Sequence, residues 1–230
     1  MESSPLPRLA GTLHTATIVV LLAAWAWLSK VGADRVGSYG NPRHVPAYLT
    51  TIAVEWLMFA LVIWGVWRHG VPLDRVVGPR WHSLREAVRD IATAAAFWVV
   101  SIIVLSILAR FVPAGSTNFI LEMLPAGRLE IALWIAISLT AGICEETIFR
   151  GYLQGQITAM TNNVAAGIVL PSIAFGAVHS SQGVRPAVLL ALYGAMFGAL
   201  AHWRKTVRPG MIAHAWNDAF AGLVQGLLRP

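Results

Sequence analysis

The residues best suited to chemistry in this 230-residue sequence are two adjacent glutamates followed by an arginine. Glu145 and Glu146 stand inside a long apolar run, and Arg150 comes four residues after the second glutamate. In a helix, Arg150 lies about 40° around the axis from Glu146, so these two side chains can form an ion pair. Glu145 lies about 140° from Arg150 and projects elsewhere. One carboxylate can therefore be held structurally while its neighbour faces a cavity as a general base.

Two histidine motifs follow toward the C-terminus. Phe175 and His179 are four residues apart and share one helical face. In the last apolar run, His214 and Asp218 also share a face, and Asn217 lies about 60° to the other side of His214. A lone histidine near the end of an apolar helix is more often interfacial than catalytic. The cluster of three polar side chains in the last run exceeds what one hydrogen bond between helices explains.

Together these residues fit a hydrolase that uses no metal. Glu145 would deprotonate a water molecule, assisted or held by His179. His214, with Asn217 or Asp218, would hydrogen-bond the oxyanion that develops at the scissile carbonyl. This arrangement predicts that His214 lies across the carbonyl from Glu145, too far away to share an ion with it. We therefore expect no cofactor and no metal.

Two other hydrolytic mechanisms could use some of the same side chains. A zinc protease could bind its metal through Glu145, His179 and His214, although the helix signature His-Glu-x-x-His is absent. Cys144, the single cysteine, could act as a nucleophile with His179. The carboxylate beside Cys144 opposes formation of the reactive thiolate, which disfavours that mechanism.

The three motifs, in this order, resemble those of the CAAX protease and bacteriocin-processing (CPBP/ABI) family of intramembrane glutamic proteases, which includes the Ras-converting CAAX endopeptidase. The family pattern is Glu-Glu-x-x-x-Arg, Phe-x-x-x-His and His-x-x-x-Asn/Asp, and residues 129–228 carry it here. The resemblance implies that Glu145 activates water with His179 as its partner. It also implies that His214 and the Asn/Asp position form the oxyanion side. The family position is Asp218, but Asn217 offers a neutral amide donor, so both belong to the predicted site. The residues expected to support that site structurally are Glu146, Arg150 and Phe175.

Membrane-spanning helices must position these motifs. Of all residues, 57% are hydrophobic and only 12% are charged, against roughly 25% charged in ordinary soluble domains. Backbone groups in hydrocarbon must be satisfied within their own segment, so the apolar runs are predicted to be helices. We predict an all-α, polytopic transmembrane bundle of about seven spans, within a range of six to eight. The apolar runs cover residues 11–29, 47–67, 90–111, 129–150, 164–179, 186–203 and 209–228.

A single long helix is predicted from residue 129 to about residue 160, followed by a turn at residues 161–163. If the next helix returns antiparallel, Glu145 and His179 lie about equally far from that turn along the chain. Because each helical residue advances the same distance, the two side chains would then reach a similar depth and could meet.

We expect residues 1–230 to form one integral membrane domain, with N-terminal spans in residues 1–128 and the catalytic core in residues 129–228. With an odd number of spans, the connections on one side carry nine Lys or Arg residues and those on the other carry seven. This weak excess favours a cytoplasmic N-terminus. The expected location is the cell membrane of a bacterium or archaeon, with multiple passes.

The predicted activity is that of an intramembrane endopeptidase acting on a membrane-associated or C-terminally modified or sorted substrate. We expect the partners to be a membrane protein or lipid-modified peptide as substrate and the membrane lipids. Despite the net charge of +6, no nucleic-acid partner is expected, because the basic residues lie mostly between apolar runs and face anionic headgroups.

Two other function classes are compatible with polar residues in spans. In a proton-coupled transporter, Glu55 and the buried glutamate and histidine side chains could relay protons. Transporters usually show internal pseudo-symmetry, which this sequence lacks. A non-catalytic scaffold or regulator of the same fold would be expected to lose a glutamate or histidine of the motifs, and all of them are present here.

Overall fold

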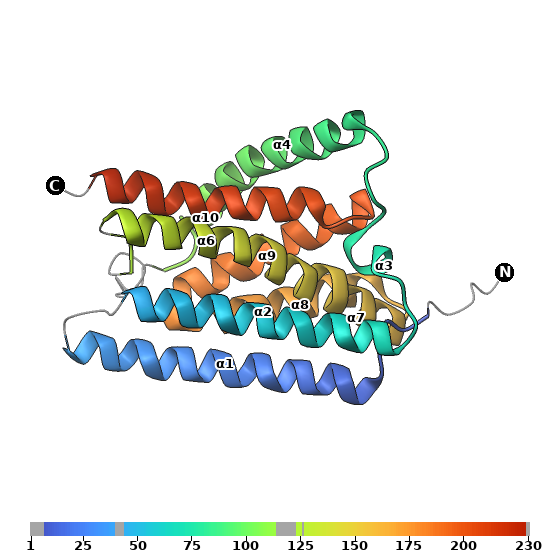
Figure 1. Cartoon of the computed structure of the whole chain (residues 1–230). Coiled ribbons are helices and arrows are strands. Elements are labelled where there is room, and N and C mark those ends of the chain that lie inside the picture. The colour runs from blue at the N-terminus through green and yellow to red at the C-terminus, as the bar shows by residue number, and fades with distance from the viewer. Residues whose placement is uncertain (1–6, 40–43, 114–122, 126, 229–230) are drawn as a thin grey trace.

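The structure of the chain, a computed structural model, describes residues 7–39, 44–113, 123–125 and 127–228. Helices make up almost all of these residues, and the described part contains no strand. The long helices run side by side in alternating directions, with α4 tilted away from the others at one end (Figure 1). In chain order the elements are α1 (Thr12–Tyr39), α2 (His44–Arg68), α3 (Asp74–Val77), α4 (Leu84–Leu108), α6 (Arg128–Glu145), the π-helix η1 (Glu146–Leu153), α7 (Gln154–Thr161), α8 (Val164–Val178), the short 3₁₀-helix η2 (Ser180–Gln182), α9 (Val184–Arg204) and α10 (Arg208–Leu228).

Five helical segments within the described residues are long and apolar enough to cross a membrane. They lie in α1, in α2, in α4, in the continuous stretch Arg128–Thr161 and in α9. The helix α8 is apolar but shorter, with 15 residues, and α10 has 21 residues that include the polar motif of the last predicted run. Each of the seven predicted apolar runs therefore falls on a helix, and the all-α polytopic class is confirmed.

The long segment that carries the two glutamates differs in one respect from its prediction. It runs without a break from residue 128 to residue 161, but its middle, η1, has π-helical hydrogen bonding. The segment ends at Asn162, whose φ of 52° is left-handed. Asn163 then caps α8 by accepting a hydrogen bond from the N–H of Ala166 at 3.1 Å. The predicted turn and the antiparallel return of α8 are confirmed, whereas the π-helical stretch was not predicted.

Two contacts set the spacing between α6 and α10, one at a glycine and one at a tryptophan. A Cβ on Gly142 would lie 2.6 Å from the carbonyl oxygen of Met211, so only glycine permits this approach of the two helices. About two helical turns before Gly142, the indole N–H of Trp134 donates to the carbonyl oxygen of Asp218 at 2.8 Å. The motifs on α6, η1 and α10 are thereby held face to face.

Hydrogen bonds between polar side chains also connect α2 to α6. The indole N–H of Trp56 donates to the hydroxyl of Thr140 at 3.2 Å. Toward the start of both helices, His44 Nδ1 lies 3.0 Å from a carboxylate oxygen of Glu130. These contacts place α2 against the helix that ends at Glu145, so α2 forms a wall beside the glutamates.

Candidate active site

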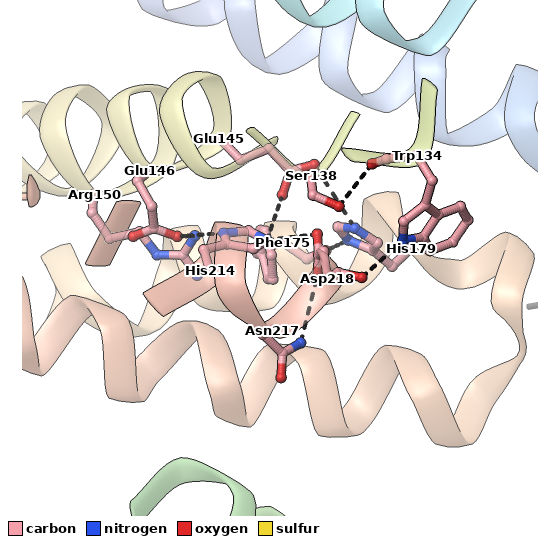
Figure 2. A network of polar contacts seen from close by, with 10 residues as sticks. All are labelled: Trp134, Ser138, Glu145, Glu146, Arg150, Phe175, His179, His214, Asn217 and Asp218. Atoms are coloured by element: carbon pink, nitrogen blue, oxygen red, sulfur yellow. Dashed lines mark hydrogen bonds and ion pairs between the residues drawn. The ribbon is translucent and has the colours of Figure 1, made fainter. Parts of the chain in front are cut away.

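The buried ion pair predicted between Glu146 and Arg150 is present. Glu146 is 0% exposed and Arg150 is 4% exposed. The Nη1 atom of Arg150 lies 2.8 Å from Oε1 of Glu146 within η1 (Figure 2). Since an unpaired charge at this depth would be strongly destabilising, each side chain compensates the other.

An aromatic box surrounds the guanidinium of Arg150. Its central carbon lies 4.2 Å from the ring centre of Phe175, 5.2 Å from that of Phe197 and 5.7 Å from that of Phe149. Ring faces attract a desolvated cation, so these contacts offset part of the cost of burying the charge. Phe175 therefore lies against the buried ion pair.

His179 comes to the site at the C-terminal end of α8. Its Nδ1 lies 2.8 Å from the backbone oxygen of Phe175, and its Nε2 lies 3.9 Å from Oε1 of Glu145. A carbonyl oxygen only accepts hydrogen bonds, so Nδ1 carries the proton in a neutral ring and Nε2 is the acceptor. The predicted meeting of Glu145 and His179 at similar depth is confirmed.

His214 lies between both glutamates, which corrects one expectation. Its Nδ1 is 3.0 Å from Oε1 of Glu146. Its Nε2 is 3.6 Å from Oε2 of Glu145 and 3.5 Å from Oδ2 of Asp218. The prediction that His214 lies far across a substrate carbonyl from Glu145 is therefore wrong, because the close packing of α10 on α6 brings the two side chains together.

Asp218 and Asn217 occupy different positions on α10. Asp218 lies on the face that His214 presents to the glutamates, as its spacing predicted. The Asn217 amide points away from Glu145 in Figure 2 and donates to Oδ1 of Asp218 at 3.3 Å. Of the two candidates for the oxyanion side, Asp218 is thus the one beside the imidazole of His214.

Glu55 on α2 adds a third carboxyl group to the same region. It interacts electrostatically with Glu145, His214 and Asp218. Its Oε2 atom is buried and has no hydrogen-bond partner among the described residues. The sequence offered Glu55 as a proton-relay residue of a transporter, and nothing in its spacing placed it beside the three motifs.

The site also contains residues that nothing in the sequence connected with it. Trp134 contacts Asp218 as described, and its backbone oxygen accepts the hydroxyl of Ser138 at 2.8 Å (Figure 2). On the opposite side, the ring of Phe197 stacks on His214 with centres 5.4 Å apart. Tryptophan in membrane proteins is typical of the headgroup level, but Trp134 forms hydrogen bonds inside the bundle.

The positions of the cysteine and of the possible metal ligands bear on the two alternative mechanisms. Cys144 is fully buried in the apolar cluster that contains Ile148, Phe149 and Tyr152, which keeps its thiol away from a substrate. Within the described ranges, no group of three His, Cys, Asp or Glu side chains is arranged to hold a metal ion. The arrangement instead offers a carboxylate beside an imidazole acceptor, with a second imidazole held by a buried ion pair.

Comparison with known proteins gives a family match for the second half of the chain. Residues 127–220 match the family model described as type II CAAX prenyl endopeptidase, Rce1-like. This range includes all eight residues predicted to form or support the site. No curated protein and no solved structure matches the chain.

Proposed function

We propose that Glu145 activates water to cleave a membrane-associated peptide. Residues 127–220 match the model of the Rce1-like type II CAAX prenyl endopeptidases. The family supports a CAAX-type protease of the membrane, and the apolar helices support its integral location. The observation that carries the glutamate mechanism is the placement of Glu145 between two imidazoles. His179 lies 3.9 Å from one of its carboxylate oxygens and His214 lies 3.6 Å from the other.

The first step uses Glu145 and His179. Their separation of 3.9 Å exceeds a direct hydrogen bond and is compatible with a shared water molecule. Both Oε1 of Glu145 and Nε2 of a neutral His179 accept, so this water would donate one hydrogen to each and keep an oxygen lone pair for attack. As that oxygen bonds to the scissile carbonyl carbon, Glu145 takes a water proton. It then returns the proton to the leaving amine when the C–N bond breaks.

The second step uses His214 to stabilise the oxyanion. Its Nδ1 donates to Glu146, which Arg150 holds in place. A ring protonated on both nitrogens would also donate from Nε2 to the carbonyl oxygen as negative charge develops there. The carboxyl groups of Glu145, Glu146 and Asp218 lie around this ring and balance its charge.

Asn217 and Asp218 complete the proposed oxyanion side. Asp218 lies 3.5 Å from Nε2 of His214 and would orient the imidazole. The amide of Asn217 would in turn hold the Asp218 carboxylate, to which it donates. The substrate class that we propose is a peptide with a lipid-modified C-terminal region, in agreement with the description of the matching family.

Replacement of Glu145 by glutamine tests the proposal. The purified Glu145→Gln variant should cleave a fluorogenic prenylated CAAX peptide about 100- to 10,000-fold more slowly than the unmodified protein, because glutamine cannot accept the water proton. Its melting temperature in detergent should stay close to that of the unmodified protein. The matched control is Glu86→Gln, which alters a partly exposed carboxylate at the start of α4 whose hydrogen bond from the N–H of His82 a glutamine oxygen can still accept. Full activity of Glu145→Gln would refute the mechanism.

A further inference from the structure

An apolar groove lies between α4 and α9, apart from the proposed active site. It has a volume of about 740 Å³. Small residues on both helices make the space, since Ala92 and Ala96 of α4 lie opposite Ala199 of α9. Phe97 and Leu200 are among the larger side chains that line it. Because the alanines are exposed, the groove opens to the surroundings of the bundle.

Unpaired basic side chains mark one end of the groove. Arg89 lines it together with Trp203, and Arg85 precedes Arg89 by one helical turn. No hydrogen bond or ion pair occupies the guanidinium of Arg85 or Arg89 within the described part of the chain. By contrast, nearby Arg204 is 2.8 Å from Asp90. The two unpaired arginines are therefore available to bind an anion.

The groove has the length and direction of a lipid chain. Along α4 its lining extends from Arg89 to Val100, which corresponds to roughly 16 Å of helix. Its basic end lies where α4 enters the membrane, beside the exposed indole of Trp203, a residue type typical of the headgroup level. An anionic group at Arg89 would thus sit at headgroup level, with an apolar chain reaching toward Val100.

We propose that this groove binds a membrane phospholipid with an anionic headgroup. Arg85 and Arg89 contact its phosphate region, and one acyl chain lies between α4 and α9. The floor of the groove links this lipid to the active-site region. Phe97 packs on Phe197 with ring centres 4.8 Å apart, and Phe197 stacks on His214. The bound chain therefore supports the aromatic layer behind the imidazole, whichever peptide the protein cleaves.

Photolabelling of the purified full chain in nanodiscs tests this site. The probe is phosphatidylglycerol with a diazirine on one acyl chain, compared with phosphatidylcholine carrying the same chain. Mass spectrometry of the labelled peptides should place the anionic probe on α4 and α9. Two arginines near the phosphate should favour it over the neutral probe by about fivefold each.

Two variants and two controls separate the headgroup contact from the chain contact. Arg89→Gln should lower labelling by the anionic probe about fivefold, and Ala96→Leu should lower labelling by both probes because it fills the groove. The exposed controls Arg80→Gln and Ala23→Leu should leave labelling unchanged. Equal labelling by both probes, or labelling unaffected by Arg89→Gln and Ala96→Leu, would overturn the proposal. Displacement of the lipid probe by a prenylated peptide would also overturn it and assign the groove to substrate.

Discussion

A single carboxylate oxygen of Glu146 serves two partners. Its Oε1 lies 2.8 Å from Nη1 of Arg150 and 3.0 Å from Nδ1 of His214. Glu145, the preceding residue, makes no contact shorter than 3.6 Å with the histidines beside it. Two adjacent residues of the same type therefore differ in role, because Oε1 of Glu146 is held by two fixed partners and the Glu145 carboxylate is not.

Removing one member of the Glu146–Arg150 pair should destabilise the protein and lower its activity. Arg150→Ala leaves a buried carboxylate without its cation, and Glu146→Gln leaves a buried guanidinium without its anion. Each change should lower the free energy of unfolding in detergent by about 3–5 kcal/mol. Arg80→Ala, at an exposed position, should change it by less than about 0.5 kcal/mol. Unchanged stability in both pair variants would show that the ion pair does not form.

Metal removal should leave the activity intact. If Glu145 and His179 activate water directly, elemental analysis should find well under one zinc per chain, and prolonged chelation should not reduce cleavage. A zinc mechanism requires three protein ligands within about 2.0–2.2 Å of one point and an open position for water. A tightly bound zinc that is lost together with activity, and that restores it on return, would make a metalloprotease the better account.

At the scale of elements, the distance between α6 and α10 decides whether the site assembles. Glu145 ends α6 and His214 belongs to α10, so any increase in that distance separates the base from the imidazole. Two glycines lie at this contact. Gly142 meets the backbone of Met211, and a Cβ on Gly210 would lie 3.0 Å from Oε2 of Glu146.

A methyl group at Gly142 should therefore impair both stability and cleavage. Gly142→Ala forces a Cβ to within 2.6 Å of the Met211 carbonyl oxygen unless the helices move apart. We expect a loss of about 1–3 kcal/mol in the free energy of unfolding, with a lower kcat for peptide cleavage. Gly32→Ala is the matched control, since a Cβ there meets nothing within 4 Å. Normal kcat and stability in Gly142→Ala would show that the close contact is not required.

At the scale of the whole molecule, one end of the bundle carries slightly more basic residues than the other. The end of α2, the start of α4, the end of α9 and the start of α10 lie together with α3 and the start of α1 (Figure 1). The residues concerned are Arg68, Arg75, Arg80, Arg85, Arg89, Arg204, Lys205 and Arg208. Because short loops rich in Lys and Arg stay in the cytoplasm, this end is expected to be cytoplasmic.

Cysteine labelling in intact cells should verify that orientation. In a Cys144→Ala background, Arg80→Cys probes the basic end and Val184→Cys probes the start of α9 at the other end. A membrane-impermeant maleimide should label Val184→Cys, which replaces a side chain that is 79% exposed. It should label Arg80→Cys only after the membrane is permeabilised. The opposite pattern would reverse the assigned topology.

The sequence by itself determined the helical class and the local geometry around each motif. Apolar runs had to be helices because hydrocarbon offers no partner for backbone groups. The spacing of four residues between Glu146 and Arg150 sufficed for their ion pair, since both side chains belong to one continuous helical segment. The turn at Asn162 similarly determined that Glu145 and His179 reach the same depth, because the two helices it connects are adjacent in the chain.

Only the tertiary structure decided how segments distant in the sequence face one another. Periodicity assigns His214 to a face of its own helix, but it contains no information about the rotation of that helix against α6. Packing at Gly142 and the Trp134–Asp218 hydrogen bond set that rotation, and they bring His214 to 3.6 Å from Glu145. The same reason explains why Glu55, on α2, could not be connected to the site from its position in the sequence. Contacts between helices depend on side-chain shapes summed over a whole interface, whereas contacts within a helix follow from spacing alone.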